Sequence, residues 1–239
     1  KVENDIKKSV NNADIIVIGV PVAAFTIVIK KIAPYLKTNC IVTDVGSVKK
    51  CFSNQTIKMI KGRCRLIPGH PIAGTEFSGA KNAKPDLFKK KWCILTPLTK
   101  NESSLSVIKK IWRSVGMNVS TMTIDEHDKI MSITSHLPHL IAFTIVGTAF
   151  GIDLKRKRDL INFSAGGFKD FTRIGSSDPK MWTDIFIKNK KHLLKTLENF
   201  LKDIDKIKKL IVDDEVGKIF SYLKRNKKIR KSIMQLSNL

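Results

Sequence analysis

In the first half of the chain, short apolar runs rich in β-branched residues alternate with segments of helical periodicity. Residues 13–22 and 39–48 are typical of strands buried on both faces, and residues 23–36 between them carry apolar side chains at helical spacing. CRLIPG (64–69) and KWCILTP (91–97) are predicted as two further strands. This alternation indicates an α/β fold with a mostly parallel, doubly wound, Rossmann-like sheet.

The second half is predicted to be helical. After a helix at 104–115 and a last strand at 117–123, the sequence TIDE (123–126) forms a capping box that opens a long apolar helix, with Pro138 expected to kink it. A glycine-rich loop is expected at 164–179, a helix at 181–212 and a basic helical tail after it. The predicted domains are therefore 1–123, nucleotide-binding, and 124–239, all-α.

The predicted helix at 181–212 carries an apolar stripe at helical spacing. Such a stripe needs a partner, which is either the core of its own domain or a second subunit. Its residues are Leu193, Leu197, Phe200, Leu201, Ile204, Ile207 and Ile211.

A dinucleotide-binding fold usually carries a G-x-G-x-x-G loop after its first strand, and the sequence contains no such loop. We therefore expect the sheet to be amino-terminally incomplete here, with its first βαβ unit preceding Lys1.

The composition excludes several classes of protein. The net charge is +23, but lysines are scattered along the chain and the densest cluster, KRKR at 155–158, is short, which argues against nucleic-acid binding. The most apolar stretch, 140–152, is too short to span a bilayer and is predicted as a buried helix, so no membrane partner is expected. The four cysteines form no C-x-x-C pair, which predicts buried free thiols and a cytoplasmic location.

Two polar motifs follow predicted strands. DVGSVK (44–49) offers a serine hydroxyl at Ser47 beside Gly46, where the missing side chain would let a ligand approach the backbone. GHPIAGTE (69–76) places His70 at the end of the next strand. Because parallel strands end at one edge, a Ser47–His70 hydrogen bond and a proton-accepting histidine are expected. An ordinary turn and a loop histidine without function are the alternatives.

Two further motifs lie in the helical half. SHLPH places His136 and His139 on one helical face; metal binding is weakly supported because no third ligand is suggested, so no metal is predicted. GGFKDFTRIGSSDPKMW supplies Arg173, whose planar fork suits a carboxylate, although a surface ion pair is the commoner role. Trp182 is expected in the core.

In this order, DVGSVK, GHPIAGTE-x-SGA, LFKKKWCILTP, SHLPH and GGFKDFTRI-x-x-SDPKMW resemble the prephenate/arogenate dehydrogenases of tyrosine biosynthesis, to about residue 215. The resemblance implies oxidative decarboxylation of prephenate or arogenate with hydride transfer to NAD or NADP, and a homodimer formed through the helical domain.

The resemblance also implies roles for individual residues. His70 would take the proton of the substrate's ring hydroxyl. Ser47 would orient His70 and lie near the nicotinamide, and Arg173 would bind a substrate carboxylate. Cleft residues would be Thr75, Glu76, His136 and His139, with Trp182 contributed by a partner subunit, and cofactor contacts would be Val20, Pro21, Gly46 and Ser47. A non-catalytic dimerising fragment without cofactor binding is the alternative.

Overall fold

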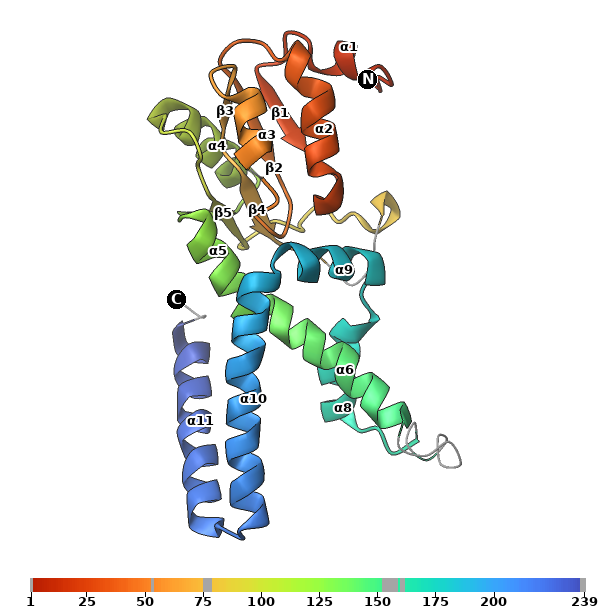
Figure 1. Ribbon diagram of the computed structural model, residues 1–239, viewed down its shortest axis with the longest axis vertical. Helices are drawn as coiled ribbons and strands as arrows, with labels where there is room; N and C mark the ends of the chain where they lie inside the picture. The colour runs from red at the N-terminus through yellow and green to blue at the C-terminus, as the bar shows by residue number, and fades with distance from the viewer. Residues whose placement is uncertain (1, 53, 75–78, 152–158, 160–161, 237–239) are drawn as a thin grey trace. The chain divides into compact units, whose positions relative to one another are not determined.

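The computed structural model describes residues 2–52, 54–74, 79–151, 159 and 162–236. The chain divides into two compact units, Lys1–Leu193 and Leu194–Leu239. The elements of the sheet region (Figure 1) are α1 Ile6–Val10, β1 Ile15–Ile18, η1 Val22–Ala24, α2 Phe25–Ile32, η2 Ala33–Tyr35, β2 Cys40–Asp44, α3 Asn54–Ile60, β3 Cys64–Leu66, β4 Gly69–Ile72, η3 Ala80–Asn82, β5 Trp92–Leu95, α4 Glu102–Ser114 and β6 Asn118–Thr121. The helical elements that follow are α5 Ile124–Met131, the π-helical turn η4 Ser132–His136, α6 Leu137–Gly151, α8 Gly166–Thr172, η6 Arg173–Ser176, α9 Pro179–Lys188, α10 Lys190–Val212 and α11 Val216–Leu236.

The strands form two hydrogen-bonded ladders, β1-β2-β3 and β4-β5-β6. The first ladder is parallel throughout, as predicted, with Ile15 opposite Ile41 and Cys40 opposite Cys64. The second contains a parallel β5–β6 pair. The two ladders are joined where the amide of Leu98, which follows β5, donates to the carbonyl of Leu66 in β3 at 3.1 Å.

One strand direction differs from the prediction of a parallel sheet, because β4 runs antiparallel to β5. The third predicted strand is in fact two short strands, and His70 lies within β4, opposite Ile94, rather than in a loop beyond a strand. Parallel neighbours need a crossover, usually a helix. Between β4 and β5 the described residues contain only the 3₁₀ turn η3, so the chain returns in the opposite direction.

Alternating side chains of the central strand enter different cores. Val42 packs with Phe25 and Ile29 of α2, whereas Ile41 packs with Ile108 of α4. Both strand residues are buried, which explains why their segment is continuously apolar. Helices therefore cover both faces of the sheet, as a doubly wound fold requires.

The long apolar helix begins as predicted, at a capping box in which Thr123 and Glu126 satisfy each other's backbone amides. Its regular α-helical bonding is interrupted by the π-helical turn η4 just before Pro138, because the proline ring cannot fit regular α-helical packing and supplies no N–H. The prediction that residues 140–152 are buried is wrong for the single chain. Within α6 only Leu137 and Ala142 are buried, and Ile145 and Phe150 are each 37% exposed. By length and composition the run Ile124–Gly151 could also cross a membrane, a test that core helices of soluble proteins pass too.

Residues 164–179, predicted as a loop, contain two helical segments, α8 and η6. The glycines misled the prediction for a structural reason. A side chain at Gly175 would lie 3.2 Å from the backbone of Ala142, so glycine here allows η6 to pack directly against α6.

The predicted helix at 181–212 is two helices, α9 and α10, separated at Asn189. In the second unit α10 and α11 run side by side (Figure 1), and residues of both line one hollow, among them Leu210 and Tyr222. Part of the apolar stripe of α10 is uncovered within the chain: Leu201 is 50% and Ile211 58% exposed, whereas Leu193 at the start of the stripe is buried.

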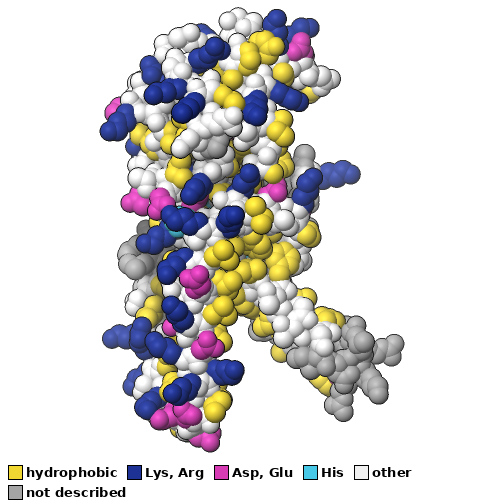
Figure 2. All heavy atoms as spheres, viewed as in Figure 1, with side chains coloured by type: hydrophobic (Ala, Val, Ile, Leu, Met, Phe, Trp, Pro, Cys, Tyr) yellow, Lys and Arg dark blue, Asp and Glu magenta, His cyan; other side chains and the backbone are white. Residues whose placement is uncertain are grey.

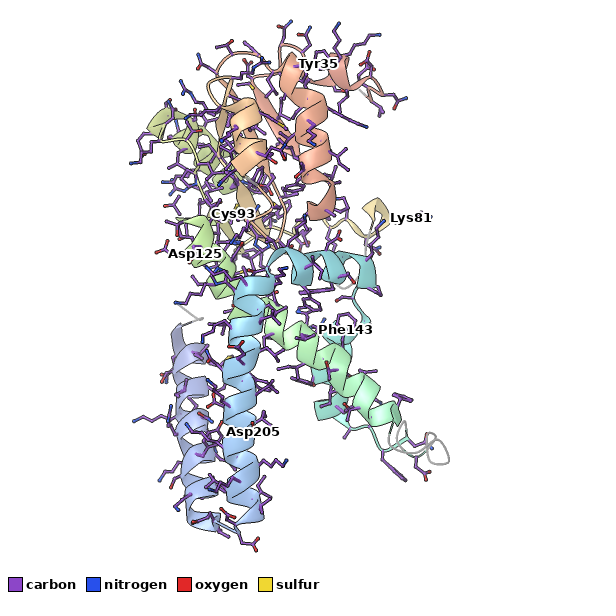
Figure 3. The ribbon with its side chains drawn as sticks, viewed as in Figure 1. Tyr35, Lys81, Cys93, Asp125, Phe143 and Asp205 are labelled. Carbon is purple, nitrogen blue, oxygen red and sulfur yellow. The ribbon has the colours of Figure 1, made fainter. Side chains whose placement is uncertain are left out.

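Lysine and arginine side chains are spread over the face of the molecule shown in Figure 2. The four cysteines are free and buried, as expected for Cys40 and Cys93 (Figure 3 labels Cys93 on β5). Burial raises the pKa of Cys51, Cys64 and Cys93 to about 12, so none of these three thiols supplies a nucleophile near neutral pH.

Candidate active site

A buried ion pair fixes the carboxyl ends of the central strands. The ammonium of Lys49 lies 2.5 Å from Oδ2 of Asp44 and 2.5 Å from the carbonyl oxygen of Gly69. Asp44 also accepts hydrogen bonds from the amides of Gly46 and Gly69. Both charged side chains have no exposed surface. Because every partner is satisfied, the network fixes the turn after β2 against the start of β4.

Glycine is required at two positions of this network because the space is already filled. A Cβ at Gly46 would lie 2.8 Å from Cζ of Phe25 and 2.9 Å from Cγ1 of Val22, and one at Gly69 would lie 3.0 Å from the carbonyl oxygen of Asp44. The expectation that Gly46 leaves room for a ligand is thus corrected, since neighbouring side chains occupy that room.

His70 is bound to a second buried histidine. Its Nδ1 lies 2.8 Å from Nε2 of His127 on α5, and Nδ1 of His127 lies 2.7 Å from Oδ1 of Asp128. His127 is fully buried, and His70 is 9% exposed. Burial is the main cause that lowers the pKa of His70 well below its usual value, and the nearby His127, Lys49 and His136 lower it further. His70 is therefore neutral at physiological pH.

Asp128 connects this histidine pair to the turn after β2. Its two carboxylate oxygens accept hydrogen bonds from the amides of Lys49 and Lys50, each at 2.9 Å. Burial alone would raise the pKa of Asp128, but the hydrogen bonds from His127 and from the two amides outweigh it and lower that pKa. The carboxylate is thus ionised and holds two segments, α5 and the turn, in one arrangement.

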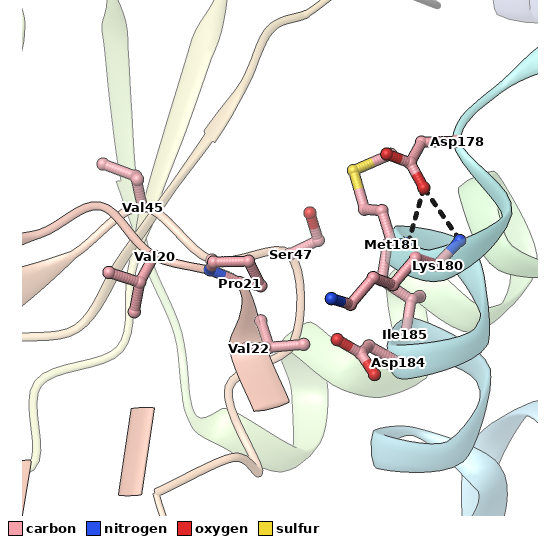
Figure 4. Close-up of a pocket in the computed structure, with 11 residues that line it drawn as sticks. Val20, Pro21, Val22, Val45, Ser47, Asp178, Lys180, Met181, Asp184 and Ile185 are labelled. Atoms are coloured by element: carbon pink, nitrogen blue, oxygen red, sulfur yellow. Dashed lines mark hydrogen bonds between the residues drawn. The ribbon is translucent and has the colours of Figure 1, made fainter. Parts of the chain in front are cut away.

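A pocket of about 380 Å³ opens at the carboxyl ends of β1 and β2 (Figure 4). Val20, Pro21, Gly46 and Ser47 line it on the sheet side, which brings together all four residues expected to contact a cofactor. α9 supplies the opposite wall, including Met181 and Ile185. Asp178 in this wall accepts hydrogen bonds from the amides of Lys180 and Met181 and so caps α9.

His139 and Trp182 are stacked, with ring centroids 3.7 Å apart and planes inclined by 19°. Burial is the main cause that lowers the pKa of His139, and the nearby charge of Arg173 also contributes. Arg173 is therefore one of the charges that act on His139. Trp182 is buried among residues of its own chain, as predicted for a core residue.

His136 is buried beside the same tryptophan, with ring centroids 6.2 Å apart. The side-chain amide of Asn189 donates to the carbonyl oxygen of Asp128 at 2.7 Å and lies 3.0 Å from Nδ1 of His136. Two buried ring nitrogens, Nε2 of His136 and Nε1 of Trp182, have no hydrogen-bond partner among the described residues. Both are available to an acceptor.

The predicted site residues do not all line one cavity, as the sequence led us to expect. Ser47 lines the pocket at the sheet edge, and neither His70 nor Arg173 is among the residues that line it. In the described part of the chain the hydrogen-bond partner of His70 Nδ1 is His127, not Ser47. Thr75 and Glu76 lie outside the described residues.

The sequence analysis missed His127, Asp128, Lys49 and Asn189. The sequence did contain a signal for two of these residues. In α5 the capping box is followed directly by His127 and Asp128, which lie on the side of the helix that carries the buried Met131. A histidine four residues before a core methionine shares its face of the helix and must find a partner there.

A doubly wound type of α/β sheet, a ligand-sized pocket at the carboxyl edge of its strands and a neutral buried histidine beside that edge are typical of enzymes of the dinucleotide-binding class. Residues 1–121 match the model of the prephenate dehydrogenase nucleotide-binding domain, and residues 123–225 match that of the prephenate dehydrogenase dimerization domain. The chain belongs to the prephenate dehydrogenase family.

Individual relatives agree with this membership. The chain is 34% identical to the cyclohexadienyl dehydrogenase of Zymomonas mobilis, covering 96% of this chain and 78% of that protein. It is 31% identical to the prephenate dehydrogenase of Bacillus subtilis, covering 92% of this chain and 60% of that one. The crystal structure of Aquifex aeolicus prephenate dehydrogenase with hydroxyphenyl propionate and NAD+ is 37% identical, with a TM-score of 0.88 over 97% of this chain and 80% of that one.

Proposed function

We propose that this chain carries out the oxidative decarboxylation of prephenate or arogenate in tyrosine biosynthesis, with NAD or NADP as hydride acceptor. The observation that carries the proposal is a neutral, buried His70 held at the sheet edge beside the turn that lines the pocket. Membership of the prephenate dehydrogenase family supports the same reaction.

The substrate is a cyclohexadienol with a carboxylate on the ring carbon opposite the hydroxyl. His70 accepts the hydroxyl proton while hydride leaves the carbon that bears this hydroxyl. The bond to the ring carboxylate then breaks, carbon dioxide departs, and the electron pair of that bond completes an aromatic ring. A buried imidazole with a lowered pKa suits this role, because it is unprotonated at neutral pH and free to accept.

The helical half supplies groups that suit an anionic substrate. Arg173 provides a cation whose charge acts on His139 of the stacked His139–Trp182 pair. The two unpartnered ring nitrogens of His136 and Trp182 add potential donors in the same aromatic cluster. We assign to this cluster the binding of a substrate carboxylate, because guanidinium and ring N–H groups form short, charge-assisted hydrogen bonds to such an anion.

The pocket at the sheet edge fits the nicotinamide end of a dinucleotide. Its sheet-side wall combines the apolar side chains of Val20 and Pro21 with the hydroxyl of Ser47, which suits a flat ring with a polar amide. When bound, the cofactor supplies the hydride acceptor. The proposal covers both NAD and NADP, because the residue that distinguishes them belongs to a G-x-G-x-x-G unit and the given sequence contains no such motif.

The test is an assay of the full-length protein with prephenate or arogenate and with NAD+ or NADP+, followed through nicotinamide absorbance. We expect turnover with at least one pairing, and the pattern of rates also assigns the substrate and the cofactor. His70→Asn should lower kcat by about 10²–10⁴-fold, the usual contribution of a general base.

The matched control is His192→Asn, which removes an imidazole that is paired with the exposed Asp125 and has no place in the hydrogen-bond chain of His70. It should leave kcat unchanged. Full turnover by a folded His70→Asn variant would exclude His70 as the base, and absence of turnover with all four pairings would exclude the proposed reaction.

A further inference from the structure

Hydrogen bonds connect three side chains in a row, from His70 through His127 to the ionised carboxylate of Asp128. The order is His70 Nδ1, His127 Nε2, His127 Nδ1 and Asp128 Oδ1, with distances of 2.8 Å and 2.7 Å. All three residues are at least nine-tenths buried. Water therefore does not compete for these hydrogen bonds, and their directions must be set within the chain itself.

The carboxylate fixes the direction of every proton in this chain. Asp128 can only accept, because it is ionised and is already bound by the amides of Lys49 and Lys50. His127 must therefore donate from Nδ1 to Asp128, which leaves its Nε2 to accept from His70. His70 must then donate from Nδ1 to that nitrogen, so its own lone pair is on Nε2.

We propose that His127, oriented by Asp128, is a positioning residue that holds His70 in the tautomer whose Nε2 accepts the substrate proton. The proposal rests on the proposed function for the identity of that proton, but the tautomer itself is a property of the folded protein. His127 is wholly buried and touches neither substrate nor cofactor in this assignment.

The same carboxylate has a second consequence. Lys49 and Lys50 directly follow the turn whose Gly46 and Ser47 line the pocket. One carboxylate therefore sets both the tautomer of the catalytic histidine and the position of the turn that faces the cofactor. His127 contacts His70 directly but reaches the turn only through Asp128, so a substitution of His127 should affect the tautomer much more than the turn.

The matched variants are His127→Leu and His127→Gln. Leucine removes the acceptor for His70 Nδ1–H and leaves that donor buried and unpaired, whereas the side-chain carbonyl of glutamine can still accept it. We expect His127→Leu to lower kcat by about 10–100-fold, corresponding to the loss of one buried hydrogen bond to the base. His127→Gln should recover most of this loss, and the KM for the cofactor should stay unchanged in both.

Asp128→Asn should differ from both histidine variants. The asparagine presents an amide donor towards three other donors, so the turn at 46–50 should loosen as well. We expect a lower kcat together with a several-fold higher KM for the cofactor. An Asp128→Asn variant that lowers kcat without any change in that KM would exclude the second role of the carboxylate.

Nitrogen-15 NMR of histidine-labelled protein reads the tautomer directly, and His70→Asn assigns the signal. We expect His70 neutral and protonated at Nδ1 in the wild type, and a mixture of tautomers in His127→Leu. A wild-type His70 protonated at Nε2, or a folded His127→Leu variant with wild-type kcat, would overturn the proposal. A wild type without dehydrogenase activity would instead count against the proposed function, while the NMR result would still decide the tautomer.

Discussion

The sheet region and the helical region of this chain treat burial in opposite ways. Around β2 and β4 even charged groups are fully buried, and each is paired, as Lys49 is with Asp44. Along α6 and α10, by contrast, large apolar side chains remain exposed, such as Phe150 and Ile204 at 37% and 43%. The sheet region thus completes its contacts within one chain, whereas the helical region presents an apolar surface of the kind that a second subunit covers.

This difference explains why the two regions should respond differently to mutation. Removing one partner of a buried ion pair destabilises the fold, because the remaining charge is neither paired nor solvated. The exposed residues of the apolar stripe, such as Ile204, should matter mainly for association, because substituting an exposed side chain costs the single chain little. We therefore propose that the chain forms a homodimer through the helical region, in agreement with its match to a dimerization domain.

Lys49→Ala should give the largest effect, because it leaves the carboxylate of Asp44 buried without its cation. We expect a loss of about 3–5 kcal/mol in the free energy of unfolding, measured by urea denaturation. Lys37→Ala is the matched control, since it breaks an exposed pair with Asp14 at 2.6 Å. It should cost less than about 1 kcal/mol. Equal losses in the two variants would contradict the contrast between buried and exposed charge.

Stability should also fall in mild acid, through the buried histidines. Burial is the main cause that lowers the pKa of His136 to about 4, despite the opposing charge of Asp128, while His127 and His139 lower it further. Above pH 6.5 the folded and unfolded states are both unprotonated at this ring. As the pH falls from 6.5 towards 4, the unfolded state takes up a proton that the folded state excludes, so stability decreases by about 3 kcal/mol.

The measurement is the free energy of unfolding between about pH 8 and pH 4, in the wild type and in His136→Asn. The variant lacks this titrating group, so its stability should fall less steeply over this range. His70, whose pKa is also lowered, contributes a decrease of the same sign in both proteins. Parallel curves for the two proteins would show that His136 does not contribute.

Gly46→Ala tests the packing of the turn beside the pocket. The added methyl group would meet Phe25 and Val22 at less than 3 Å, so we expect a loss of about 1–3 kcal/mol together with weaker cofactor binding. Gly19→Ala is the control, because a Cβ at Gly19 would meet nothing within 4 Å. Thermal unfolding measures the first effect and calorimetry with NAD+ the second. A Gly46→Ala variant with wild-type stability would contradict the close packing.

The smallest expected change concerns the helical region. Ile204→Glu introduces a charge into the apolar stripe, and it should raise the dissociation constant of the dimer at least tenfold, about 1.4 kcal/mol, in sedimentation equilibrium. Lys202→Glu, on the opposite side of α10, makes at least as large a change in charge and should leave association intact. A monomeric wild type would exclude the homodimer.

The sequence alone determined the layers of this protein. Continuous apolar runs such as that of β2 are only compatible with strands covered on both faces, and the capping box at Thr123 marked the start of the helical half. The four residues expected at a cofactor, from Val20 to Ser47, do line one pocket, because the ends of neighbouring parallel strands lie at the same sheet edge.

Only the tertiary structure decided the direction of β4 and the partner of His70. The direction of a strand depends on the segment that connects it to its neighbour, not on its own apolar pattern. The pattern of β4 therefore did not predict its antiparallel direction. The bond between His70 and His127 joins residues 57 positions apart. Local periodicity cannot encode such a pairing, because it arises only when α5 packs against the sheet edge and both imidazoles lose their water.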